Sequence, residues 1–217
     1  MKQTTTTAPS LALSTLLLLL AGCSSMYYST MESFGVHKRD ILADRVEAGR
    51  DSQEDAKDQF QTTLEAFKDV SGFDGGDLEE FYGKINSEYE RCEARANAVH
   101  ERIEGIEDVA EALFSEWQAE IEEFTSAEHR SRSEEMLRDT QDRYASLMNV
   151  MRKAEDRMTP VLKAFRNEVM LLKHSLNAQA IASLQANVTS IESDLAVLVR
   201  DMEASIAEAD AFIESLG

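Results

Sequence analysis

The feature that most constrains this chain is a long stripe of apolar residues with helical spacing, which begins at Leu78 and ends at Phe124. The stripe consists of Leu78, Phe81, Ile85, Tyr89, Cys92, Ala96, Val99, Ile103, Ile106, Ala110, Leu113, Trp117, Ile121 and Phe124. Its mean step is about 3.5 residues, the value that keeps one helix face against a partner in a coiled coil. A single helix of this length extends about 70 Å. Such a helix is too long for burial in a compact globule, so it needs a partner along its whole side.

Three other segments carry apolar stripes of similar length and can supply these partners. A first helix is predicted over residues 37–70, and a third follows a reversal between Thr125 and Ser133. The last helix carries the stripe that runs from Ile181 to Phe212. These patterns predict an all-α fold, an elongated antiparallel helical bundle or coiled coil of about four long helices. We expect this helical coiled-coil domain to cover residues 37–217.

Three local features qualify the predicted helices. Residues 47–57 contain few large apolar side chains, so we expect that part of the first helix to be loosely packed. Residues 71–77 contain three glycines and form the clearest turn. Pro160 removes one helical hydrogen bond, so we expect a kink or a local restart of the helix with Thr159 as N-cap.

The boundary before the last helix has two interpretations. Asn177 fits an N-cap, with Leu176 and Ile181 placed as a hydrophobic staple. Against this, a step of four continues the stripe through Leu172, Leu176, Ala180 and Leu184. We favour a turn near residues 174–177, because it gives four segments that can pack antiparallel within one chain. A continuous helix would leave half its stripe unpartnered and would imply a dimer.

The N-terminal segment indicates export and lipid attachment. Residues 1–22 have the charged, apolar and small-residue regions of a secretory signal peptide. The sequence Leu20-Ala21-Gly22-Cys23 resembles the lipobox of bacterial lipoproteins, which implies that Cys23 carries the lipid and that residues 23–36 form a tether. Ser24 follows the cysteine where an aspartate commonly retains such proteins in the inner membrane. We therefore expect a lipid-anchored protein of the cell envelope, on the outer membrane and facing the periplasm.

Charge and cysteine content narrow the partners. The chain has 22 Lys and Arg residues against 41 Asp and Glu residues, a net charge of −19. Nucleic-acid binding is not expected, because such proteins present basic patches. With Cys23 lipidated, Cys92 has no intrachain partner. Because Cys92 lies on the apolar stripe, we interpret it as a small buried hydrophobe, with an intermolecular disulfide as the alternative.

The sequence contains no motif for a metal or phosphate centre. No glutamate stands three residues before any histidine (His37, His100, His129 and His174), as a bundle di-iron site requires. Gly83-Lys84 lacks the rest of a P-loop. We therefore predict no catalytic residue, no metal and no cofactor.

Two sets of side chains have a second interpretation that we consider weaker. The acidic residues are read as solvated faces and turn residues rather than as catalytic or calcium sites: Asp74, Asp77, Glu79, Glu80, Glu122, Glu123, Glu134 and Glu135. A further set is read as core rather than as the lining of a ligand groove: Trp117, Met136, Met148, Met151, Met158 and Met170.

Four stretches carry a resemblance to a known family. They are His37-Lys38-Arg39-Asp40-Ile41-Leu42, Phe73-Asp74-Gly75-Gly76-Asp77-Leu78, Val109-Ala110-Glu111-Ala112-Leu113-Phe114 and Leu172-Lys173-His174-Ser175-Leu176-Asn177-Ala178. The chain resembles an uncharacterised family of mainly proteobacterial lipoproteins, catalogued as a domain of unknown function. The resemblance implies an exported helical protein and carries no assigned activity.

These observations favour a non-enzymatic envelope lipoprotein that acts as a membrane-tethered scaffold or adaptor. Its partners would be the membrane, through the lipid anchor, and either another protein or a second copy of itself. The alternative is a periplasmic carrier that holds a lipid or another amphiphile within the helical bundle. An enzyme built from dispersed carboxylates is the least favoured hypothesis, because catalytic carboxylates need an enclosed site that shifts their pKa.

Overall fold

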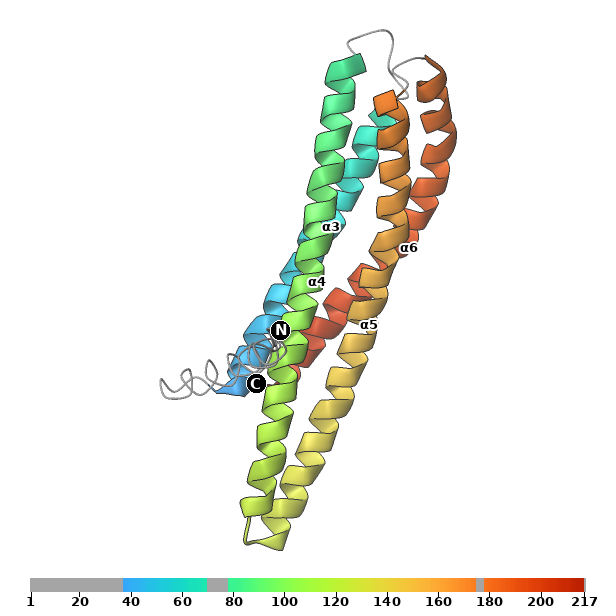
Figure 1. Ribbon diagram of the computed structural model, residues 1–217. Coiled ribbons are helices and arrows are strands. Elements are labelled where there is room, and N and C mark those ends of the chain that lie inside the picture. The colour runs from blue at the N-terminus through green and yellow to red at the C-terminus, as the bar shows by residue number, and fades with distance from the viewer. Residues whose placement is uncertain (1–36, 70–77, 175–177, 217) are drawn as a thin grey trace, which may run out of the picture.

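Four long antiparallel helices form the part of the chain that the computed structural model describes, residues 37–69, 78–174 and 178–216 (Figure 1). They are α3 (Lys38–Asp69), α4 (Leu78–Glu123), α5 (Ala127–His174) and α6 (Ala178–Leu216). Helix α3 packs against α4 and α6, and α5 packs against the same two helices. The four helices therefore close into a ring around one core. The predicted all-α antiparallel bundle is confirmed.

The helix boundaries follow the sequence signals closely. Helix α3 was predicted over residues 37–70 and covers Lys38–Asp69, and α4 begins at Leu78, where the long stripe begins. Helix α5 ends at His174, and α6 begins at Ala178 as a separate helix. This confirms the favoured interpretation of that boundary. The glycine-rich residues 71–77 and the proposed N-cap Asn177 lie outside the described residues.

One apolar stripe from each helix builds the core. Phe67 of α3 stacks on Phe165 of α5 with ring centroids 5.0 Å apart, and Phe60 lies 6.3 Å from the same ring. All three rings are fully buried. Burying one such side chain contributes about 1.5–3 kcal/mol, and the buried stripe runs from Leu42 at one end of α3 to Leu172 near the end of α5. The helices are thus held together by side chains along most of their length.

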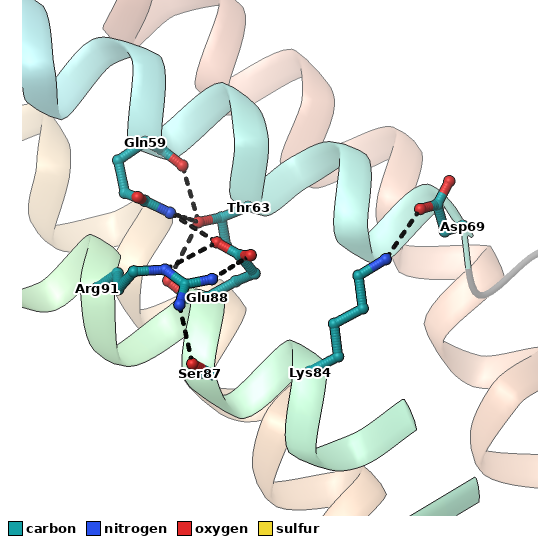
Figure 2. Close-up of polar contacts among 7 residues, drawn as sticks. All are labelled: Gln59, Thr63, Asp69, Lys84, Ser87, Glu88 and Arg91. Carbon is teal, nitrogen blue, oxygen red and sulfur yellow. Dashed lines mark hydrogen bonds and ion pairs between the residues drawn. The ribbon is translucent and has the colours of Figure 1, made fainter. Parts of the chain in front are cut away.

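Polar contacts join α3 to α4 beside this core (Figure 2). The hydroxyl of the buried Thr63 donates to the backbone carbonyl of Gln59 at 2.8 Å, and the Gln59 amide donates to Glu88 at 2.9 Å. Arg91 pairs with the same carboxylate from one turn further along α4. Thr63 is therefore buried without an unsatisfied hydroxyl, which would otherwise cost about 1–3 kcal/mol.

The expectation of loose packing over residues 47–57 is wrong. Gly49, Gln53 and Ala56 of this stretch are buried, and they continue the steps of three and four residues that the stripe follows on either side. A Cβ atom added to Gly49 would lie 2.9 Å from Cδ1 of Ile106 and 3.1 Å from Cε of Met151. Small side chains here allow the neighbouring helices to approach closely, so the absence of large residues marks close packing.

Two further expectations about α5 need correction. The polar run after Ser126 belongs to the first turns of α5, so the reversal occupies only residues 124–126. The helix also continues through Pro160, and the predicted restart at Thr159 does not occur. Pro160 is tolerated because the stripe of α5 remains buried on each side of it, at Met158 and Val161.

Two glycines on different helix faces give a test of this packing. Gly83 of α4 is exposed and has no atom within 4 Å of an added Cβ, so Gly83→Ala should stabilise the chain by about 0.5–1 kcal/mol through helix propensity. Gly49→Leu should destabilise it by about 1–3 kcal/mol, because Ile106 and Met151 are fully buried and have little room to move. Thermal unfolding followed by circular dichroism measures both changes. Equal responses at the two sites would contradict the close packing around Gly49.

Candidate interaction surface

Helices α4 and α5 extend past the end of the four-helix bundle as a two-helix hairpin (Figure 1). At the base of this extension, Lys38 in the first turn of α3 pairs with Glu116 of α4 at 2.9 Å. Near the end of α6, the ring of Phe212 lies 6.4 Å from that of Tyr144. Residues 117–139 therefore lie beyond the ends of α3 and α6, and we call them the projecting hairpin.

The tip of the projecting hairpin reverses without a glycine. The carbonyl of Ser126 accepts a hydrogen bond from the Arg130 amide at 3.0 Å, and the Ser126 hydroxyl accepts one from the His129 amide at 3.4 Å. Ser126 is therefore the N-cap of α5. The guanidinium of Arg130 donates to the carbonyl oxygens of Glu122 and Phe124 at the end of α4. This arginine satisfies carbonyl groups that a helix end leaves without intrahelical partners.

A groove lies at the base of the projecting hairpin and has a volume of about 480 Å³. We call it the Trp117 groove. Its lining comes from three helices: His37, Lys38 and Arg39 at the start of α3, Leu113, Glu116, Trp117 and Glu120 of α4, and Met136 of α5. The indole N–H of Trp117 donates to the Ser133 hydroxyl at 2.9 Å. This bond fixes the ring against α5, and the Trp117 side chain lines the groove.

The methionines divide between core and surface. Met148, Met151 and Met158 are buried, as expected for core residues. Met136 and Met170 are 52% and 46% exposed, so the expectation that they pack in the core is wrong. Met136 is exposed because it lies on the projecting hairpin, where α3 and α6 no longer cover α5. The structure thus brings Met136 and Trp117 together in one groove.

Sequence reasoning missed the buried polar side chains, among them Gln53, Glu168 and Ser205. Gln53 and Ser205 are fully buried, and neither amide atom of Gln53 nor the Ser205 hydroxyl has a hydrogen-bond partner among the described residues. Glu168 is 7% exposed and accepts a hydrogen bond from Asn187 at 2.8 Å. Burial raises the pKa of Glu168, and the Asn187 contact opposes that rise. The positions of Gln53, Glu168 and Ser205 on the apolar stripes were the sequence signal that could have revealed their burial.

Cys92 is fully buried on the stripe of α4, which confirms its interpretation as a small hydrophobe. Burial raises the pKa of its thiol to about 12, while a hydrogen bond with Thr63 acts in the opposite direction. A neutral thiol without access to solvent is a poor nucleophile. An intermolecular disulfide at this position would require the bundle to open.

Most carboxylates of the described helices face solvent. The residues of the predicted acidic pairs are exposed, apart from a half-buried Glu134. Over the described ranges, no group of three or more His, Cys, Asp or Glu side chains is arranged to hold a metal ion. No helix within those ranges combines the length and apolar composition that crossing a bilayer requires. The predicted lipid site Cys23 lies outside the described residues.

Comparison with protein families places these features in context. A family model described as a protein of unknown function (DUF2959) matches residues 27–216. The chain belongs to the DUF2959 family. No curated protein and no solved structure matches the chain. The function of this DUF2959 protein is therefore inferred from the arrangement of its own residues.

An exposed charge cluster joins α4 to α5 and gives a pH-dependent test. Nδ1 of His100 lies 2.5 Å from a carboxylate oxygen of Glu155, and Nε2 lies 3.3 Å from Glu104. The Glu155 hydrogen bond is the main reason why the pKa of His100 is raised. A raised pKa in the folded state adds stability below the unfolded pKa of about 6.5, and this stability is lost as pH rises through the folded value.

We therefore expect His100→Gln to lower the melting temperature more at about pH 6 than at about pH 9. At the lower pH, the wild type carries an imidazolium that Glu155 stabilises, and the substitution removes it. At the higher pH, the wild-type imidazole is already neutral, so the substitution removes no charge. The same substitution in a Glu155→Gln background is the control, and there the pH dependence should be much smaller. An equal loss at both pH values would show that the ion pair does not contribute.

Proposed function

We propose that this DUF2959 protein is a non-catalytic envelope lipoprotein that acts as a membrane-tethered scaffold or adaptor for a protein partner. In this proposal Cys23 carries the lipid, and the bundle stands in the periplasm on the outer membrane. The observation that carries the proposal is the projecting hairpin. It extends past the bundle at the end where α3 begins (Figure 1).

The tether limits how far the hairpin can lie from the lipid anchor. Residues 23–36 number fourteen, and a chain of that length spans at most about 50 Å when fully extended. The base of the projecting hairpin contacts the start of α3 through Lys38 and Glu116. The base of the hairpin would therefore lie within about 50 Å of the anchor.

The surface of the projecting hairpin favours a partner with a basic face. Seven carboxylates and three arginines lie between residues 117 and 139. Complementary charge of this kind steers association and selects partners more than it adds affinity. Phe124 is 39% exposed at the tip and supplies an apolar anchor within the acidic surroundings. The hairpin thus combines charge for encounter with an aromatic ring for contact.

The interior of the bundle supports the adaptor over the carrier hypothesis. Large side chains from three helices, including Phe60, Ile103 and Phe165, are fully buried in one cluster. Close approach of Gly49 to Ile106 and Met151 reduces the free space at mid-length. A ligand the size of a lipid would have to displace these contacts, at the cost of the apolar burial that holds the helices together.

The anchor is tested by metabolic labelling of cells with an alkyne analogue of palmitate. We expect the wild-type chain to incorporate the label and the Cys23→Ser variant to lose it, because the thioether to the lipid requires the thiol. Cys92→Ser is the matched control and should keep the label. Density-gradient separation of the two membranes then locates the labelled chain. Label that persists in Cys23→Ser would refute the anchor.

The partner surface is tested by photo-crosslinking in intact cells. A photo-reactive residue at Gln118 or Ser131, both exposed on the projecting hairpin, should capture one recurrent envelope protein, identified by mass spectrometry. The same residue at Ser193, exposed on α6 within the four-helix part, is the control and should not capture it. Equal capture from all three positions, or capture of lipid alone, would contradict an adaptor role for the hairpin.

A further inference from the structure

We propose that residues 27–36 of the same chain occupy the Trp117 groove, with Phe34 placed against Trp117 and Met136. This inference goes beyond the adaptor function, because it concerns a contact within the chain and does not depend on a protein partner. It assigns an occupant to the groove and a role to the segment that links the bundle to its N-terminal region.

The path of the chain leads directly to the groove. His37, the first described residue, lines the groove together with Lys38 and Arg39. Phe34 precedes His37 by three residues, so their Cα atoms are separated by at most about 10 Å. The segment before α3 therefore begins at the edge of the groove and needs only a short reversal to enter it.

The chemistry of the segment fits the lining of the groove. Residues 27–36 include Tyr27, Tyr28, Met31, Phe34 and Val36. The groove offers the half-buried ring of Trp117, the 52% exposed Met136 and, beneath them, Leu113. An aromatic ring between an indole and a thioether gains ring-edge and sulfur contacts in addition to burial.

Charge also favours this arrangement. Glu32 is the one residue within residues 27–36 that is charged at neutral pH. The rim of the groove on the α3 side carries the exposed side chains of His37 and Arg39. On the α4 side, Glu116 pairs with Lys38 and Glu120 is exposed, so an incoming carboxylate is attracted only to the side that carries His37 and Arg39. A segment with one acidic residue matches that rim.

Two further observations favour this occupant over a separate molecule. The family match begins at residue 27, so the segment belongs to the same DUF2959 unit as the helices. A segment joined to the groove by so few residues also has an effective local concentration of order millimolar or higher. A second chain or a free partner would have to displace a segment that is present at this effective concentration. The only cost to the segment is the conformational entropy that it loses on binding.

Trp117 is the one tryptophan of the chain, so its fluorescence reports on the groove directly. The full chain isolated from cells is compared with Phe34→Ala by emission spectrum and by acrylamide quenching. Loss of the Phe34 ring should shift the emission to longer wavelength and raise the quenching constant. Phe124→Ala, which removes an exposed ring at the hairpin tip, is the matched control and should leave both values unchanged.

A crosslinking pair provides an independent readout. Phe34→Cys combined with Met136→Cys should form a disulfide within one chain under mild oxidation. Phe34→Cys combined with Met170→Cys should not, because Met170 is also exposed on α5 but lies about 50 Å further along the helix. The native Cys92 is buried and does not interfere.

The proposal is overturned if Phe34→Ala leaves the emission and quenching of Trp117 unchanged and the Phe34→Cys, Met136→Cys pair does not form. It is also overturned if that pair links two chains into a dimer rather than closing within one, because a second copy would then fill the groove. None of these outcomes bears on crosslinking from the hairpin, so failure of this proposal and failure of the adaptor function can be told apart.

Discussion

The structure depends on burying one apolar stripe along the full length of α4. A helix of 46 residues is about 70 Å long, and most of its stability must come from packing of that face rather than from helix propensity. Helices α3 and α5 cover the stripe from two sides, and α6 closes the ring between them. Because α3 and α6 stop before α4 and α5 do, the final turns of the stripe are covered by α5 alone. The projecting hairpin is a direct result of this difference in helix length.

Basic residues are concentrated where neighbouring helices meet. Each of the four helix contacts has an ion pair: Lys38–Glu116, Arg152–Glu107, Lys153–Asp201 and Lys68–Glu192. In each pair at least one partner remains open to solvent, so each contributes about 0–1 kcal/mol and the effect on total stability is small. The use of cations at helix contacts leaves the excess of carboxylates on the outer faces.

Much of the fold was predictable from the sequence because the apolar stripes and the glycine-rich turn fix where helices begin and end. The contrast between Gly49 and Met136 shows where this reasoning stops. Gly49 lacks a side chain, yet it is buried because its neighbours approach closely. Met136 is apolar and on the stripe, yet it is exposed because α3 and α6 end before reaching it. Both outcomes depend on how the helices are aligned relative to one another along the bundle. The apolar stripe of one helix does not specify that alignment. The sequence therefore offered a groove lined by Trp117 and Met136 only as the weaker interpretation, because it does not show where the neighbouring helices end.

The position of the Trp117 groove at the start of α3 affects how far the bundle can stand above the bilayer. If residues 27–36 occupy the groove as we propose, only residues 23–26 separate the proposed lipid from the bundle. Release of those ten residues adds up to about 35 Å of reach. The anchored protein would then have two standing heights, one against the membrane surface and one well above it. The depth at which a partner lies in the periplasm would decide which of the two is used.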